Sequence, residues 1–149
     1  MDKLTIWADG ACEPNPGKGG YGYIIRGMGK QLTANGYDPQ STNQRMEVTA
    51  ILEALKNISK PYDITIYTDS MYCVNTITKW LAGWLAKKIE KANMDLWYEY
   101  VRLSAPHKIQ IYHVKGHAGH EMNEACDQLA VSAIKGVKVY EVKEVPESF

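Results

Sequence analysis

A six-residue pattern occurs twice in this chain of 149 residues and constrains how the chain can fold. Thr5–Gly10 reads T-I-W-A-D-G, and Thr65–Ser70 reads T-I-Y-T-D-S. Each copy is a run of β-branched and aromatic residues, typical of a strand, that ends in an aspartate followed by a small residue. In open α/β sheets, ligands bind beyond the carboxyl ends of the strands. If the two strands are parallel neighbours, Asp9 and Asp69 lie side by side at one end of the sheet.

Two such neighbouring aspartates are compatible with two interpretations. Carboxylates this close repel each other, so that one holds a proton unless a divalent cation lies between them. The simpler alternative is that Asp9 and Asp69 are turn residues that end two ordinary strands. The other residues of the chain are needed to distinguish a cation-binding site from two turns.

The composition is that of an ordinary globular domain, with 45% hydrophobic and 23% charged residues. Lys+Arg and Asp+Glu both number 17, so any surface for nucleic acid must be local. The 3 cysteines lack metal-ligand spacing, and we expect reduced thiols in a cytoplasmic protein. The first residues do not have the pattern of a signal peptide, and no apolar run approaches the roughly 20 residues that span a bilayer, so we expect no membrane association.

The expected order of elements is strand-strand-strand-helix-strand-helices-strand-helix. The strands are expected at 4–8, 21–26, 30–37, 64–68 and 109–114, and the helices at about 43–58, within about 70–103 and at about 121–134. The Gly- and Pro-rich segment 10–20 is expected to be a loop. Gly27-Met28-Gly29 is a hairpin signal, so the first three strands should form an antiparallel meander.

These elements predict an α/β fold with a mixed five-stranded sheet and helices on both faces. The strand–helix–strand crossovers make the fourth and fifth strands parallel to the first. We expect residues 1–136 to form one domain. Residues 137–149 are expected to be a tail that is either an extra edge strand or disordered.

The helix at about 43–58 carries a carboxylate on the face predicted to be buried. Glu47 begins an apolar stripe that Ile51 and Leu55 continue at helical spacing. A carboxylate that points inward is costly unless it is paired or binds a metal. The alternative is that the first turn of the helix is exposed to solvent, or that Glu47 pairs with Arg45 or a lysine.

Four carboxylates thus come from four separate elements: Asp9, Glu47, Asp69, and Asp127 in the last helix. Hard oxygen ligands suit Mg²⁺ or Mn²⁺. Two such ions about 4 Å apart can hold the attacking water and the leaving oxygen of a phosphodiester in line. His117, in a glycine-flanked loop, has a side chain that can take or deliver a proton near neutral pH.

Five motifs of the chain, in this order, resemble those of type 1 ribonucleases H. They are A-D-G-A-C-E-P-N-P-G-K-G-G-Y-G (Ala8–Gly22), T-N-Q-R-M-E (Thr42–Glu47), T-D-S-M-Y (Thr68–Tyr72), M-D-L-W (Met94–Trp97) and V-K-G-H-A-G-H-E-M-N-E-A-C-D (Val114–Asp127). Any one of them would be a weak signal, but all five at compatible spacings are specific. The resemblance extends from 4 to about 133 and implies the ribonuclease H fold.

The resemblance implies an endonuclease that cleaves the RNA strand of RNA/DNA hybrids and leaves 5′-phosphate and 3′-hydroxyl ends. It implies two Mg²⁺ ions, which Mn²⁺ can replace, held by Asp9, Glu47, Asp69 and Asp127. We expect Asp9 to bridge both ions, Asp127 to complete the site that activates water, and Glu47 and Asp69 to serve the leaving group. The family's loop histidine, thought to help the product leave, matches His117. We expect a monomer that binds a hybrid duplex and no organic cofactor.

The resemblance also implies contacts to each strand of the hybrid. Hybrids are close to A-form and show their 2′-hydroxyls in a wide, shallow minor groove. The implied substrate-binding residues are Asn15, Asn43 and Gln44 for the RNA strand, Thr42 and Asn93 for a phosphate of the DNA strand, Trp80 and Trp84 for the DNA-strand channel, and Gly10 beside Asp9. The chain departs from the family at Gln40, where the phosphate pocket often has an arginine, and its segment between Trp80 and Trp97 is shorter than the well-known bacterial basic protrusion.

Other interpretations of the sequence remain open. Gly17-x-Gly19-x-x-Gly22 matches a dinucleotide-binding fingerprint, although such a motif should open a helix and this one continues as a strand. His113, His117, His120 and Cys126 could suggest zinc, although their spacing fits no common site. A nuclease or strand-transferase of the same fold acting on DNA or double-stranded RNA is one alternative function. A non-catalytic module that binds hybrids is another.

Overall fold

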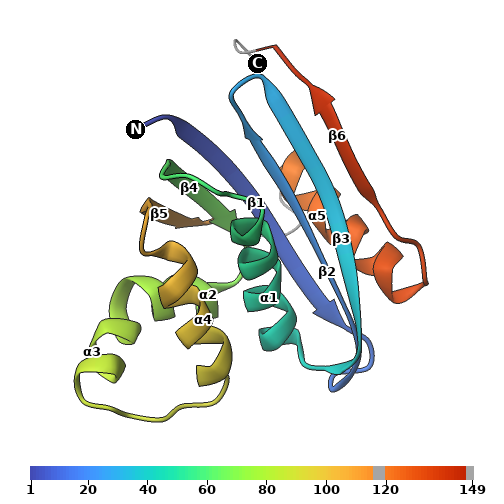
Figure 1. Cartoon of the computed structure of the whole chain (residues 1–149). Coiled ribbons are helices and arrows are strands. Elements are labelled where there is room, and N and C mark those ends of the chain that lie inside the picture. The colour runs from blue at the N-terminus through green and yellow to red at the C-terminus, as the bar shows by residue number, and fades with distance from the viewer. Residues whose placement is uncertain (116–119, 147–149) are drawn as a thin grey trace.

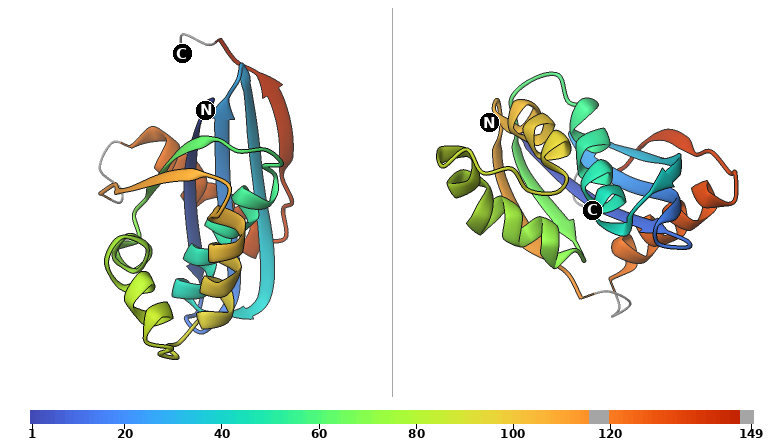
Figure 2. Two further views of the ribbon diagram at one scale, coloured as in Figure 1. Left: turned by 60° about the vertical axis from the view of Figure 1, so that its left-hand side comes forward. Right: turned by 90° about the horizontal axis from the view of Figure 1, so that it is seen from below.

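The computed structural model describes residues 1–115 and 120–146, which form one six-stranded sheet with helices on both faces (Figure 1). The strands are β1 (Lys3–Cys12), β2 (Gly17–Gly27), β3 (Lys30–Ser41), β4 (Asp63–Thr68), β5 (Lys108–His113) and β6 (Tyr140–Glu144). The helices are α1 (Asn43–Lys56), α2 (Met71–Asn75), a π-helical turn η1 (Thr76–Trp80), α3 (Leu81–Ala86), α4 (Met94–Ser104) and α5 (Glu121–Ile134). Helix α1 packs on one face of the sheet together with α4, and α5 packs on the opposite face (Figure 2).

The strand order is β5-β4-β1-β2-β3-β6. Strands β1, β2 and β3 are antiparallel neighbours, while β4 pairs with β1 and β5 in parallel. The predicted meander and the predicted parallel strands are therefore confirmed. Alternate residues of β1 and β4 are buried in the core and include Ile6, Ile64 and Ile66, the period-two pattern expected of strands with one covered face.

The sheet has six strands rather than the predicted five, because the tail forms the extra edge strand that was one of its two expected forms. Strand β6 pairs antiparallel with β3, with Lys30 opposite Glu144 and Ala34 opposite Tyr140. The side chain of Asn35 binds the segment that precedes β6. Its Nδ2 donates to the carbonyl of Val137 at 2.9 Å, and its Oδ1 accepts from the backbone nitrogen of Val139 at 2.7 Å. The side chains of β6 are all exposed, so the strand has no buried periodicity that a sequence pattern could reveal.

The prediction of a loop at 10–20 was also largely wrong. Strand β1 continues to Cys12 and β2 begins at Gly17, so that only residues 13–16 connect the two strands. A Cβ at Gly20 would overlap the carbonyl of Ala130 in α5. Glycine in this segment therefore allows a helix to lie directly on the strand, and no helix opens after the glycines as a dinucleotide site would require.

The helical region expected within 70–103 is divided into α2, η1, α3 and α4. Trp97 in α4 is fully buried in the core that α1 shares with the sheet. Within the two described ranges, no helix is both long enough and apolar enough to cross a membrane.

Candidate active site

The aspartates of the repeated hexapeptide lie at the same end of two paired strands. Trp7 of β1 is opposite Tyr67 of β4 in the parallel register, and Asp9 and Asp69 each follow two residues later. Asp9 is only 5% exposed. Burial, the charge of Asp69, a side-chain hydrogen bond with Asp69 and the charge of Asp127 together raise the pKa of Asp9 to about 9. These three carboxylates are therefore brought together, from β1, β4 and α5.

The fourth carboxylate, Glu47 in the first turns of α1, lies close enough to Asp69 for the two charges to interact. Burial raises the pKa of Glu47 to about 7, Ser70 opposes this by hydrogen bonding, and the charge of Asp69 adds to it. Ser70 also caps α2, because its Oγ accepts from the backbone of Cys73 at 3.1 Å. Arg45 forms its ion pair with Asp95 rather than with Glu47.

Gly10 allows α1 to approach the end of β1. A Cβ at Gly10 would overlap the carbonyl group of Met46 and would lie 2.5 Å from the backbone nitrogen of Glu47. Any larger residue would push the first turns of α1 away from the strand. The sequence suggested a substrate contact for Gly10, whereas its position in the structure explains how Glu47 reaches the carboxylate cluster.

The donor chemistry of the cluster fits a divalent cation. The four side chains are carboxylates. A cation would stabilise the ionised forms of Asp9 and Glu47, which burial and neighbouring negative charge otherwise disfavour. Within residues 1–115 and 120–146, no three His, Cys, Asp or Glu side chains are already arranged to hold a metal ion. The zinc alternative has no support among these residues; His113 Nε2 instead lies 3.2 Å from the backbone oxygen of Asp69.

Two asparagines predicted to contact RNA lie at the junction of the β1–β2 turn and α1. The backbone nitrogen of Asn43 donates to Asn15 Oδ1 at 3.1 Å, and the backbone nitrogen of Cys12 donates to Asn43 Oδ1 at 2.7 Å. Both side-chain oxygens therefore accept hydrogen bonds from the backbone. No hydrogen bond within the described residues uses the side-chain nitrogen of either asparagine. Gln44, the third predicted contact, is exposed in the first turn of α1.

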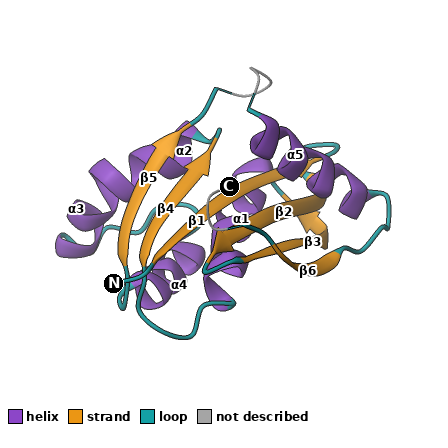
Figure 3. Ribbon diagram, turned by 90° about the horizontal axis from the view of Figure 1, so that it is seen from above, coloured by secondary structure: helices purple, strands orange, loops and turns teal. Residues whose placement is uncertain are grey.

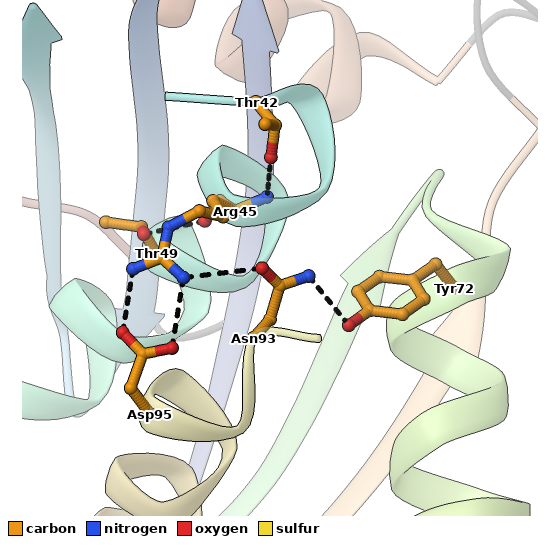
Figure 4. Close-up of polar contacts among 6 residues, drawn as sticks. All are labelled: Thr42, Arg45, Thr49, Tyr72, Asn93 and Asp95. Carbon is orange, nitrogen blue, oxygen red and sulfur yellow. Dashed lines mark hydrogen bonds and ion pairs between the residues drawn. The ribbon is translucent and has the colours of Figure 1, made fainter. Parts of the chain in front are cut away.

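The two residues of the predicted phosphate pocket, Thr42 and Asn93, are linked through Arg45 (Figure 4). Thr42 caps α1, and its Oγ1 accepts from the backbone of Arg45 at 3.1 Å. The guanidinium of Arg45 donates to both carboxylate oxygens of Asp95, at 2.8 and 3.0 Å, and to Asn93 Oδ1 at 3.3 Å. The structure thus places a cation beside Thr42 and Asn93, on α1 rather than at Gln40.

Asn93 is also fixed from its other side. Its Nδ2 donates to the hydroxyl oxygen of Tyr72 at 3.1 Å, and this oxygen accepts a second hydrogen bond from Trp97 Nε1 at 2.9 Å. Sequence reasoning missed Arg45, Tyr72 and Asp95 as parts of the site. Each belongs to a motif that carries the family resemblance, so their presence was visible, but the contacts among the three motifs were not.

The two tryptophans predicted to face the DNA strand form a stacked pair. The ring centroids of Trp80 and Trp84 are 5.9 Å apart with planes 28° from parallel, and Lys91 Nζ lies 5.9 Å from the Trp84 ring. Trp80 is 41% exposed and ends the π-helical turn. His117, the predicted loop histidine, lies outside the described residues.

The six-stranded mixed sheet, with helices on both faces and carboxylates gathered where β1 and β4 stop pairing, defines an α/β domain with a candidate carboxylate site. The chain belongs to the ribonuclease H family, whose model matches residues 1–135. A ribonuclease H of Gluconobacter oxydans is 45% identical over 134 residues, which cover 86% of this chain and 89% of that one.

Two solved structures share the fold. LC9-RNase H1, a type 1 RNase H with the type 2 active-site motif, has a TM-score of 0.85 at 27% identity. The match covers 99% of this chain and 80% of the LC9-RNase H1 chain. LC11-RNase H1, solved in complex with an RNA/DNA hybrid, has a TM-score of 0.71 at 19% identity and covers 89% of this chain and 96% of its own. The predicted family and fold are confirmed.

Proposed function

We propose that this protein hydrolyses the RNA strand of RNA/DNA hybrids with the help of divalent cations, leaving 5′-phosphate and 3′-hydroxyl ends. The observation that carries the proposal is the cluster of Asp9, Asp69 and Asp127, in which the neighbouring carboxylates and burial raise the pKa of Asp9 to about 9. Such a cluster costs folding free energy unless a cation neutralises it. The hybrid bound by LC11-RNase H1 supports the same class of substrate for this chain.

Asp9, Glu47, Asp69 and Asp127 are the residues that would hold the cations. Two bound Mg²⁺ ions, or Mn²⁺ in their place, would stabilise the developing charge on the phosphate and lower the pKa of a bound water. Asp9 and Glu47 would have to release their protons for the cations to bind. The surrounding protein would keep the four carboxylates in place. Ser70 holds Glu47, and Gly10 sets its distance from β1.

The protein's polar groups can distinguish the two strands of the hybrid. The side-chain nitrogens of Asn15 and Asn43 are available to donate to the ribose hydroxyls of the RNA strand, because both oxygens are used internally. Thr42, Arg45 and Asn93 suit a phosphate of the DNA strand, with Arg45 supplying the positive charge.

Further contacts complete the proposal. Gln44 adds a contact to the RNA strand, and Trp80 with Trp84 offers flat surfaces to deoxyriboses. His117 is proposed, from its place in the sequence, to assist proton transfer or product release. We also propose a catalytic domain of residues 1–136 in a cytoplasmic monomer without an organic cofactor; the cysteines Cys12, Cys73 and Cys126 are free and buried, which supports a reducing compartment.

A cleavage assay with one strand labelled at a time tests the proposal. RNA/DNA, RNA/RNA, DNA/DNA and single-stranded RNA are each incubated with the protein and Mg²⁺, Mn²⁺ or EDTA. Cuts confined to the RNA of the hybrid and dependent on the cation are the expected result. Cuts in DNA/DNA or RNA/RNA would favour a different nuclease of the same fold, and hybrid binding without cleavage would favour a non-catalytic module.

A further inference from the structure

One half of the sheet is uncovered on the face that carries α5. Helix α5 packs against β1, β2 and β3, and no helix within the described part of the chain crosses β4 and β5 on this face (Figure 3). Alternate residues of β4 confirm the difference between the two faces: Ile64 and Ile66 are buried on the opposite face, whereas Thr65 and Tyr67 are partly exposed on this one. The open area is therefore a surface of β1, β4 and β5 that solvent reaches.

A row of aromatic rings crosses this open face. Trp7, Tyr67 and Tyr112 are aligned in register across β1, β4 and β5. The rings of Trp7 and Tyr67 are stacked with centroids 6.1 Å apart, and those of Tyr67 and Tyr112 are 5.9 Å apart. His120 lies 6.5 Å from the Tyr67 ring, and Tyr112 is 52% exposed.

The other side chains of this face are polar or charged. From β1, β4 and β5, the residues aligned with the aromatic row on the same face are Lys3, Thr5, Asp63, Thr65, Lys108 and Gln110. Three of the six, Lys3, Asp63 and Lys108, are of the charged types that are depleted in protein–protein interfaces. The flat rings, threonines and lysines of this face suit the bases and phosphates of a nucleic-acid strand.

A guanidinium borders the row at the neighbouring strand. Arg26 of β2 lies with its Cζ 5.6 Å from the Trp7 ring centroid, and its Nε donates to Gln31 Oε1 at 2.8 Å. Lys3 and Lys108 flank Asp63 in register, so the row of the open face farthest from the carboxylate cluster carries two lysines and one acid. Positive charge beside stacked rings is the combination that binds single strands without sequence preference.

The aromatic row is continuous with the carboxylate cluster. Asp9 follows Trp7 by two residues, which is about 7 Å along β1 and on the same face. Asp69 follows Tyr67 by two residues, directly beyond the end of β4. An RNA strand that leaves the carboxylate cluster can therefore pass directly onto the aromatic rings. We propose that Trp7, Tyr67 and Tyr112 form a platform on which unpaired bases of the RNA strand stack where that strand extends beyond the hybrid.

This proposal rests on the proposed function, since it concerns the same RNA strand. Aromatic pairs across strands also stabilise a sheet, so a lower melting temperature of a variant would not distinguish a platform from a structural row. The distinguishing property is a preference for substrates with single-stranded RNA. Sheets that present aromatic rings to bases are a general means of binding single-stranded RNA.

The test compares binding of a blunt RNA/DNA hybrid with binding of the same hybrid carrying an unpaired 5′ or 3′ RNA extension. Dissociation constants are measured by fluorescence anisotropy in the Asp9→Asn background, so that cleavage does not interfere. We expect at least one extended hybrid to bind about fivefold more tightly or better than the blunt one, and Tyr112→Ala to remove this preference. Tyr112→Phe, which keeps a flat ring, should retain the preference.

Two further variants serve as controls. Tyr140→Ala removes a tyrosine that is 65% exposed on β6, at the opposite edge of the sheet, and should leave the preference unchanged. If Tyr112→Ala does not fold, Tyr112→Leu replaces it, because leucine keeps apolar bulk without a ring.

Equal binding of blunt and extended hybrids, or a preference that survives Tyr112→Ala or Tyr112→Leu, would overturn the platform. Failure of the proposed function would appear separately, as an absence of cleavage of the blunt hybrid in the strand-labelled assay.

Discussion

Gly10 of β1 and Met46 of α1 are in direct backbone apposition, so that a Cβ on Gly10 would overlap the Met46 carbonyl group. This contact sets how closely the first turns of α1 approach the end of β1. It places Glu47, the next residue of the helix, where the charge of Asp69 helps raise the pKa of Glu47 to about 7. A glycine in the strand thus determines where a carboxylate of the helix lies.

Gly10→Ala is expected to lower both stability and activity. Overpacking of this kind costs on the order of 1–3 kcal/mol, and the displaced helix carries Glu47 away from the cluster. Gly83→Ala is the matched control, because a Cβ at Gly83 meets nothing within 4 Å and alanine should stabilise α3 by about 1 kcal/mol. Urea unfolding and hybrid cleavage are measured for both variants. Full activity in Gly10→Ala would contradict the proposed role of the close contact.

Asp9→Asn is expected to abolish cleavage while hybrid binding survives. Losing the central carboxylate should reduce the rate by a factor on the order of 10³ or more, because cation binding fails when its buried ligand is neutral. Single-turnover cleavage and anisotropy of the same hybrid provide the two measurements. A second measurement is the melting temperature, which Mg²⁺ should raise in the wild-type protein and leave unchanged in Asp9→Asn. Retained cleavage in the variant would refute the assignment of Asp9.

The stability of the cation-free protein is expected to fall as the pH rises. The pKa of Asp9 is raised from 3.8 to about 9 and that of Glu47 from 4.5 to about 7, so the folded state holds protons that the unfolded state has released. Their contribution to stability is complete below about pH 4 and is lost as the pH rises through about 7 and about 9. The total change should be on the order of a few kcal/mol.

Urea unfolding in EDTA at about pH 5, 7 and 9 measures this dependence. Asp9→Asn should flatten the curve and make the variant more stable than the wild-type protein at the highest pH. Mg²⁺ should restore much of the lost stability of the wild type at that pH, since it stabilises the ionised carboxylates. Identical pH slopes for the wild type and Asp9→Asn would show that the proton on Asp9 does not contribute.

Asp95→Ala is expected to weaken hybrid binding more than it weakens the fold. The exposed ion pair between Arg45 and Asp95 contributes about 1 kcal/mol or less to stability, but it fixes the guanidinium beside Asn93. We expect KM for the hybrid to rise about three- to tenfold with kcat little changed. Lys56→Ala is the control, because it breaks partly exposed ion pairs with Glu53 and Glu99. Equal effects of the two substitutions on KM would contradict a role for the Arg45–Asp95 pair in binding.

Sequence patterns were reliable where one local signal decides the structure. The repeated hexapeptide predicted two strands, which are found within β1 and β4, and the apolar stripe that begins at Glu47 predicted a helix at about 43–58, which is found as α1. The hairpin signal at 27–29 and the crossover rule predicted the antiparallel and parallel pairings. Periodicity and turn chemistry act over a few residues, so they can be read without knowledge of the rest of the chain.

Only the tertiary structure decided which distant residues meet. The glycines at 10–20 indicated a loop by composition, but most of this segment belongs to β1 and β2, and α5 packs directly upon Gly20. Strand β6 depends on Asn35, more than 100 residues away, and the pair of Arg45 with Asp95 joins two motifs 50 residues apart. The sequence by itself indicated which carboxylates are candidates for the chemistry. Their proximity and raised pKa values arise from burial and neighbouring charge, which exist only once the sheet and its helices have come together.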